Sequence, residues 1–139
     1  MKKTVKSLLV VLLMGITLLM LTGCGGNKLV ATKETDDESY GKYTEKAVIL
    51  FDNNKVSKVT TTMEYENEDT ATQVYAIFNW AKSMATDGEL DGFDVKQDKN
   101  KITMEMDAKV FADQEGISEE DMTKEAVKKS LEENGYTVK

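Results

Sequence analysis

Strict alternation of apolar and polar side chains near the C-terminal third constrains the fold of this chain most strongly. Between residues 102 and 109 the apolar positions are every second one: Ile102, Met104, Met106 and Ala108. A period of two indicates a strand with one face in a core and the other in water. Residues 56–66 alternate in the same way and are rich in threonine and valine, which favour strands. The sequence therefore predicts an antiparallel sheet.

Each predicted strand has a neighbour in sequence with which it can form a hairpin. Residues 43–51 are dense in apolar side chains and are followed by the turn sequence Asp-Asn-Asn-Lys before the strand at 56–66. Residues 93–97 precede the strand at 102–109, with a second polar turn between them. Two runs of this kind separated by a short polar turn are typical of a hairpin.

Helical patterns follow both hairpins. Apolar residues lie three and four apart within residues 70–86, which is the stripe of an amphipathic helix. A second helix is expected to start at Ser118 or Thr123 and to end at Asn134–Gly135, where glycine suits the position after a helix C-cap. We therefore expect an α+β domain of order β-β-α-β-β-α, with a four-stranded, mostly antiparallel sheet and two helices on one face.

The beginning of the chain has the pattern of an export signal. Three lysines precede an apolar run over residues 8–21, which is shorter than the roughly 20 residues that a membrane-spanning helix needs. Leu21-Thr22-Gly23-Cys24 follows directly and resembles the lipobox of bacterial lipoproteins. The resemblance implies cleavage after Gly23, diacylglycerol on the sulfur of Cys24, and a protein anchored in the cell membrane on its extracytoplasmic side.

This signal divides the chain into three parts. Residues 1–23 would be the lipoprotein signal peptide and residues 43–139 the single α+β domain. Residues 24–42 are polar and have neither a helical nor a strand period, so we expect a lipidated flexible tether there. Fully extended, such a tether would reach about 60 Å.

Residue types exclude several classes of function. The chain carries a net charge of −7 and no histidine, and its only cysteine is Cys24. The acidic balance argues against a nucleic-acid partner. Without histidine or a free thiol, no Ser-His-Asp site, thiol catalysis or zinc–cysteine site can form. We therefore expect a non-catalytic protein without a cofactor. A carboxylate-based hydrolase is the minor alternative, because such an enzyme needs only two carboxylates close together and the chain has 25 acidic residues.

The segment 87–98 offers an alternative function in calcium binding. Its acids at loop positions 1, 3 and 5, with glycine at 6, resemble the calcium loop of EF-hands. The resemblance implies ligands at Asp87, Glu89, Asp91 and Asp98. Position 3 is a long glutamate, position 12 is a short aspartate, and a strand rather than a helix is expected to follow. The competing interpretation is a solvated turn, with Gly88 ending the preceding helix.

Over its full length the chain resembles the small YehR-like bacterial lipoproteins. It shares their lipobox, an early hairpin that steps from Lys55-Val56 into a threonine-rich strand, a middle helix and a final amphipathic helix ending at Asn134-Gly135-Tyr136. This family is essentially uncharacterised, so the resemblance implies location and fold and transfers no catalytic or binding residue.

The expected function is therefore that of an envelope lipoprotein that binds an unknown protein, peptide, glycan or small molecule. The candidate surface is the free face of the predicted sheet, with Lys58, Thr60, Thr62, Glu64, Thr103, Glu105 and Lys109. Tyr75 and Trp80 on the first helix are either a ligand platform or, as we prefer, the edge of the helix–sheet core. Met104 and Met106 are interpreted as core residues rather than as a thioether metal site.

Overall fold

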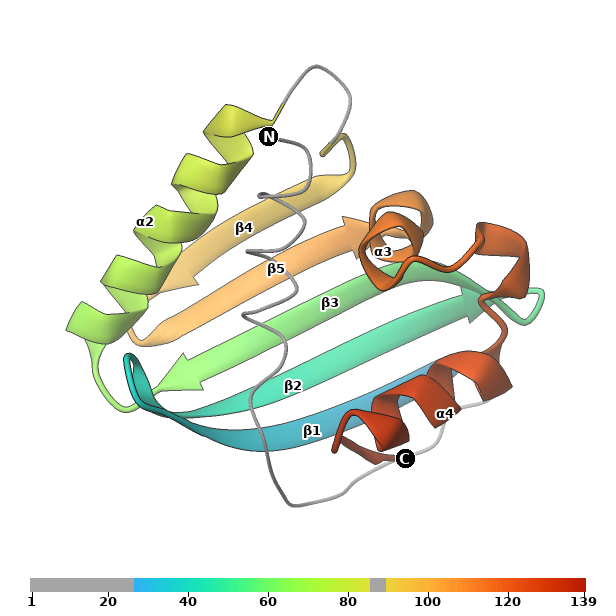
Figure 1. Ribbon diagram of the computed structural model, residues 1–139, viewed down its shortest axis with the longest axis horizontal. Helices are drawn as coiled ribbons and strands as arrows, with labels where there is room; N and C mark the ends of the chain where they lie inside the picture. Colours follow the sequence, from blue (N-terminus) through green and yellow to red (C-terminus); the bar gives the residue numbers. More distant parts are fainter. Residues whose placement is uncertain (1–26, 86–89) are drawn as a thin grey trace.

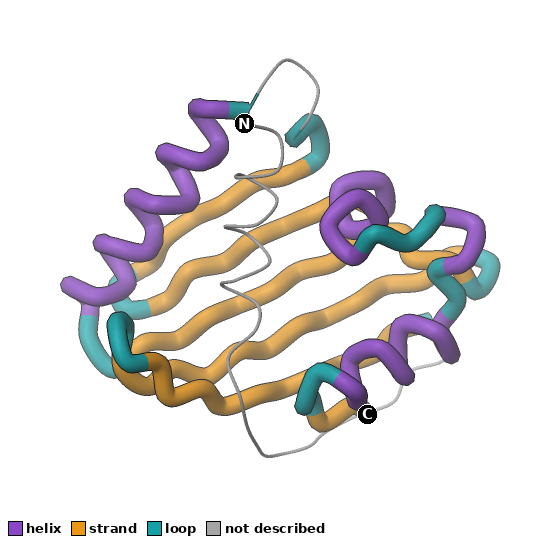
Figure 2. The backbone as a smooth tube through the Cα atoms, in the orientation of Figure 1, coloured by secondary structure: helices purple, strands orange, loops and turns teal. Residues whose placement is uncertain are grey.

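A computed structural model describes residues 27–85 and 90–139, which form one six-stranded antiparallel sheet with helices packed against it (Figure 1). The strands are β1 (Lys28–Asp37), β2 (Gly41–Asp52), β3 (Lys55–Tyr65), β4 (Phe93–Asp98), β5 (Lys101–Asp107) and β6 (Thr137–Val138), in the spatial order β4-β5-β3-β2-β1-β6. The helices are α2 (Glu68–Met84), α3 (Ala108–Glu115), the 3₁₀ turn η1 (Glu119–Asp121) and α4 (Lys124–Glu133). The tube in Figure 2 shows the strands side by side, with the helices near the two opposite edges of the sheet.

The predicted four-stranded sheet with two helices is wrong. The order is β-β-β-α-β-β-α-η-α-β, because β1 and β6 add two strands on the far side of β2. The helix α3, directly after β5, is also absent from the order that the sequence predicts. The side chain of Asp107 there accepts a hydrogen bond from the backbone N–H of Val110 at 2.9 Å, and this N-cap starts a helix directly after β5.

The predicted flexible tether is wrong from Lys28 onward, since residues 28–37 form the ten-residue strand β1. The register pairs every residue of β1 with one of β2, from Lys28 opposite Leu50 to Asp37 opposite Gly41. The apolar alternation fails because the buried positions in the second half of β1 are Lys33 and Thr35. The domain therefore starts about fifteen residues earlier than the predicted boundary at residue 43.

Short turns with left-handed backbone connect the strands. Asn53 and Asn54 both have positive φ, 48° and 62°, which is the conformation that twists a two-residue hairpin loop correctly between β2 and β3. The carboxylate of Asp37 accepts the N–H groups of Ser39 and Tyr40, at 2.7 and 3.0 Å, and so shapes the turn from β1 to β2. These turns fix the register of the three longest strands.

All the helices pack on the same face of the sheet. Three of the four buried side chains of α2 (Ala71, Val74 and Phe78) and the buried side chains of α3 and α4 belong to one core cluster with inward side chains of β2, β3, β4 and β5. Figure 1 shows α2 beside β4 and α4 beside β1, so the two helices stand at opposite sides of this face. No helix within residues 27–85 and 90–139 is long and apolar enough to cross a membrane.

Candidate functional site

A buried lysine–glutamate pair lies on the helix-bearing face of β1 and β2. Lys33 and Glu45 are directly opposite each other in the antiparallel register. Only 2% of Lys33 and 1% of Glu45 is exposed to solvent. Charged residues are almost never this deeply buried unless they have partners.

The partners come from the end of α4. Gly135, at φ 83°, ends that helix in a Schellman motif, in which the N–H groups of Gly135 and Tyr136 bond to the carbonyls of Glu132 and Leu131. This return of the chain points Tyr136 at the sheet, where its hydroxyl donates to Oε1 of Glu45 at 2.6 Å.

Lys33 is bound to the same segment. Its Nζ donates to the carbonyl oxygen of Asn134 at 3.0 Å and lies 5.0 Å from the ring centroid of Tyr136. The three buried side chains Lys33, Glu45 and Tyr136, which we call the buried polar group, together with the backbone carbonyl of Asn134 therefore join the C-terminal segment to β1 and β2.

Burial changes the acid–base behaviour of the pair. Loss of hydration raises the pKa of the Glu45 carboxyl to about 7, although the hydrogen bond from Tyr136 and the charge of Lys33 act in the opposite direction. Burial lowers the pKa of Lys33, and the charge of Glu45 partly offsets this. Glu45 therefore exchanges its proton near neutral pH in the folded protein.

Two tyrosines with tilted rings in contact lie next to the buried polar group. Tyr43 and Tyr65 are cross-strand partners on β2 and β3, with ring centroids 4.9 Å apart and an interplanar angle of 31°. The Tyr65 hydroxyl donates to the sulfur of Met63 at 3.6 Å. Burial raises the pKa of Tyr43 to about 12, and the charge of Glu45 adds to the effect, so both the packing and the electrostatics connect this pair to its neighbours.

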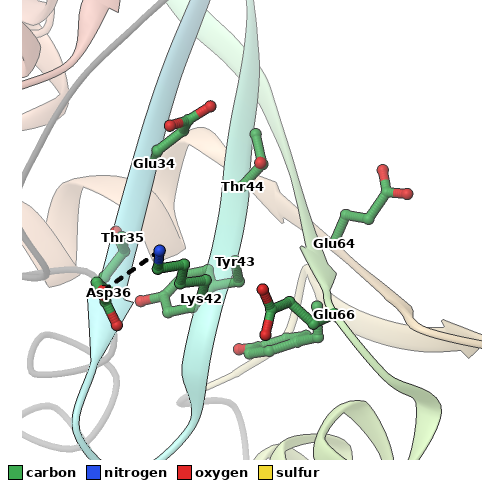
Figure 3. Close-up of a pocket in the computed structure, with 9 residues that line it drawn as sticks. Glu34, Thr35, Asp36, Lys42, Tyr43, Thr44, Glu64 and Glu66 are labelled. Atoms are coloured by element: carbon green, nitrogen blue, oxygen red, sulfur yellow. Dashed lines mark ion pairs between the residues drawn. The ribbon is translucent and has the colours of Figure 1, made fainter.

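A cavity of about 540 Å³ opens where β1, β2 and β3 approach the β1–β2 turn. Figure 3 shows its lining side chains, all of them from these three strands or from the residue after β3. The charged ones include four acids and one lysine, and we call this the acidic cavity: Glu34, Asp36, Lys42, Glu64 and Glu66. Thr35, Tyr43, Thr44 and Tyr65 complete the lining.

The charges of the acidic cavity are only partly neutralised. Lys42 lies 3.9 Å from Asp36, and Glu64 pairs at 3.3 Å with Lys101, which is outside the lining. Among the described residues, neither Glu34 nor Glu66 takes part in an ion pair. The same part of the chain contains no group of three acidic or thiol side chains that could hold a metal ion. With four carboxylates and one lysine, the lining of the cavity carries a net negative charge.

The structure brings together few of the sequence-predicted site residues. Cys24, Asp87 and Glu89 lie outside the described residues. Asp91 precedes β4 and Asp98 ends it, and a six-residue strand is about 16 Å long from first to last Cα. These two carboxylates consequently do not meet in one calcium loop, and calcium binding by the segment stays a prediction.

The predicted binding face carries its own ion pairs. Lys58 is 3.0 Å from Glu105, and Glu64 is 3.3 Å from Lys101, so much of the charge on this face is already paired within the protein. Lys109 is not on this face of the sheet at all, because it lies in α3.

The predicted roles of the aromatic and methionine side chains had mixed outcomes. Tyr75 packs against the core, whereas Trp80 is 55% exposed, so the preferred interpretation fails for Trp80. Met104 and Met106 are buried in the core cluster, as the alternation predicts.

The sequence did not indicate the buried polar group, and of the residues that line the acidic cavity only Glu64 belonged to the predicted binding face. One signal was present: Glu45 shares its face of β2 with Tyr43, Ala47, Ile49 and Phe51, which is an acid in a buried stripe. Its partners Lys33 and Tyr136 are twelve and ninety-one residues away, and no local pattern connects them.

Comparison with known proteins leaves the family open. No protein-family model matches the chain, and no curated protein matches it. One similar solved structure is an NMR structure of a protein from Streptococcus pneumoniae TIGR4, with 14% identity and a TM-score of 0.43 over 88% of this chain and 92% of that one.

Proposed function

We propose that this protein is a lipid-anchored, non-catalytic binding module of the bacterial envelope, and that the acidic cavity takes a positively charged group of its ligand. Anchoring through Cys24 follows from the lipobox, and the resemblance to YehR-like lipoproteins supports the same location. The ligand site follows from the cavity. An envelope protein, a peptide or a small molecule with an amine or guanidinium group fits this description.

The observation that carries the proposal is the combination of volume and charge. Ligand pockets usually measure about 300–1,000 Å³, and the 540 Å³ of the acidic cavity falls within this range. Four carboxylates and one lysine line it, and Glu34 and Glu66 are without an ion pair among the described residues.

The buried polar group supports a non-catalytic role. Catalysis by a carboxyl with a raised pKa requires access to a substrate proton. Glu45 is 1% exposed, its Oε1 accepts the Tyr136 hydroxyl, and its neighbour Lys33 is bound to the Asn134 carbonyl. These contacts are those of a structural connection between β1, β2 and the C-terminal segment.

Titration with N-acetyl-lysine methylamide tests the ligand site. We expect amide shifts in the ¹H–¹⁵N spectrum that centre on Tyr43, Thr44 and Tyr65, with binding that weakens as salt rises. Replacing Glu34 and Glu66 together by glutamine should weaken binding about fivefold, since two exposed charge interactions are worth about 1 kcal/mol in total.

The matched control replaces Glu119 and Glu120 by glutamine. Both residues are exposed on η1, far from the cavity in the fold, and the net charge changes by the same amount. If the two double variants weaken binding equally, the probe responds to net charge alone, and the acidic cavity is not the site.

Membrane fractionation tests the anchor. The wild-type protein should enter the detergent phase of a Triton X-114 separation, and the Cys24→Ala protein should lose its acyl chains and leave that phase. A Cys24→Ala protein that stays in the detergent phase as completely as the wild type would show that the lipobox interpretation is wrong.

A further inference from the structure

Strand β1 has an outer edge that the fold covers only in part. β6 pairs with Ala31 and Thr32, and Val30 exchanges two backbone hydrogen bonds of 3.0 Å with Lys139. β6 does not extend past Thr32, because the residues before β6 belong to the turn at Gly135 and to α4. The rest of β1, residues 33–37, borders no further strand in the described part of the chain.

The alternation of backbone direction identifies the free groups. The N–H and C=O of Val30 both point outward to Lys139, whereas the carbonyl of Asn27 points inward to the N–H of Phe51. In a strand this direction alternates from residue to residue. The N–H and C=O groups of Glu34 and Asp36 therefore point outward, and within the described residues nothing is hydrogen-bonded to them.

At the opposite edge of the sheet, α2 lies beside β4 (Figure 1). The ammonium of Lys82 on α2 reaches Asp94 on β4 at 3.3 Å, and the side-chain amide of Gln97 donates to the hydroxyl of Thr72 at 2.8 Å. These bridges tie the helix to β4 along that edge, a common way of blocking unwanted strand pairing.

The charge of the free edge selects its occupant. The side chains of Glu34 and Asp36 lie at this edge and also line the acidic cavity, and Asp37 and Glu38 follow them. Pairing with a second copy of this chain, edge to edge, would bring the same acids opposite one another, and like charges in that position are destabilising. A partner with alternating basic residues has the complementary charge.

We propose that an extended peptide bearing lysine or arginine adds as a seventh strand along residues 33–37 of β1, with its basic side chains directed into the acidic cavity. This inference rests on the proposed function and names the partner class for the same site. Backbone hydrogen bonds to Glu34 and Asp36 would provide the alignment, and the carboxylates would select the sequence, as in other cases of strand addition.

The probe is an acetylated, amidated and fluorescein-labelled eight-residue peptide of alternating lysine and threonine, titrated by anisotropy against the full chain in detergent micelles. Two further peptides have the same sequence. In one, the backbone nitrogen of every lysine carries a methyl group, and in the other the backbone nitrogen of every threonine does. In an added strand only alternate N–H groups point at the neighbour. An antiparallel peptide would use the lysine N–H groups, and a parallel one the threonine N–H groups. We expect one methylated peptide to bind at least tenfold more weakly and the other to bind within twofold of the parent.

Substitutions at Asp36 test the protein side of the same contact. Asp36→Pro removes the outward N–H, and Asp36→Asn removes the same charge but keeps that N–H. Proline is tolerated on edge strands. The proline variant should therefore bind the parent peptide at least fivefold more weakly than the asparagine variant, while its amide spectrum stays dispersed.

The outcomes separate this inference from the function on which it rests. If both methylated peptides bind like the parent, or if N-acetyl-lysine methylamide binds in the cavity and the peptide does not bind, strand addition is refuted and the acidic cavity stands. If neither probe binds, both proposals fail. A dimer in sedimentation that Asp36→Pro dissociates would assign the edge to a second copy and would overturn the peptide as its occupant.

Discussion

Replacement of Glu45 by glutamine should remove a large part of the pH dependence of stability. Glutamine keeps the size of the side chain and an oxygen that accepts the Tyr136 hydroxyl, but it cannot ionise. In the wild type, the pKa of Glu45 is raised from the ordinary value of 4.5 to about 7, mainly by burial. The variant therefore isolates the cost of holding a carboxylate among β1, β2 and the C-terminal segment.

The pKa values of Glu45 in the folded and unfolded chain determine how the free energy of unfolding changes with pH. Below pH 4.5 the carboxyl is protonated in both the folded and the unfolded chain. Between pH 4.5 and 7 the unfolded chain releases the proton and the folded chain keeps it, so the free energy of unfolding falls as pH rises. Above pH 7 the loss is complete, and it amounts to about 3 kcal/mol at 1.36 kcal/mol per unit of pKa.

Urea unfolding followed by circular dichroism at pH 4.5, 5.5, 6.5 and 8 measures this effect. The difference in the free energy of unfolding between Glu45→Gln and the wild type should grow by about 3 kcal/mol in favour of the variant from pH 4.5 to pH 8. Subtraction of the wild-type curve removes the contribution of the other acidic residues to the pH dependence. The matched control is Glu119→Gln at an exposed position, which should show no such trend. A difference that is constant with pH would refute the reasoning.

Two further substitutions probe contacts of the same fold. Tyr136→Phe removes the 2.6 Å hydrogen bond to Glu45, and should cost about 1–3 kcal/mol at pH 8 and less at pH 4.5, where the carboxyl is neutral; an equal loss at both values in urea unfolding would contradict this charge dependence. Gly92→Ala should cost about 2 kcal/mol or more in the thermal unfolding free energy, because Gly92 has a φ of 90° and a Cβ there would overlap the carboxylate of Asp107. Gly41→Ala is its control, because φ there is 71° and no atom of the surrounding structure lies within 4 Å of the added Cβ; it should cost about 1 kcal/mol. Equal losses at the two positions would mean that the side chain of Asp107 moves away from the new Cβ at no cost, and would contradict this prediction.

The parts of the fold that sequence could predict are those with local signals. The β2–β3 turn is an example, because Asn53 and Asn54 are residues that accept positive φ, and the strands on both sides alternate clearly. The end of α4 is another, since Gly135 takes the left-handed position that glycine favours. In each case the amino acids that determine the structure are neighbours in the chain.

The parts that sequence could not predict depend on partners from elsewhere. The first half of β1 has a buried apolar residue at Leu29, but its second half places Lys33 and Thr35 on the buried face. Those positions are acceptable only because Glu45 and the end of α4 supply the partners. The pattern of hydrophobic residues does not reveal a buried face that is polar. The segment was therefore predicted to be a linker, and the part of the acidic cavity that β1 lines was not predicted.

The early start of β1 has a consequence for how the domain would stand on a membrane. Only four residue steps separate Cys24 from Lys28, a reach of at most about 14 Å, instead of the long tether that composition indicated. β1 runs from that end for about 30 Å before it reaches the turn beside the acidic cavity. A lipid on Cys24 would therefore keep the domain close to the headgroups with little freedom to swing. The free edge of β1 at residues 33–37 and the acidic cavity would then lie at the end of the strands that is remote from the bilayer.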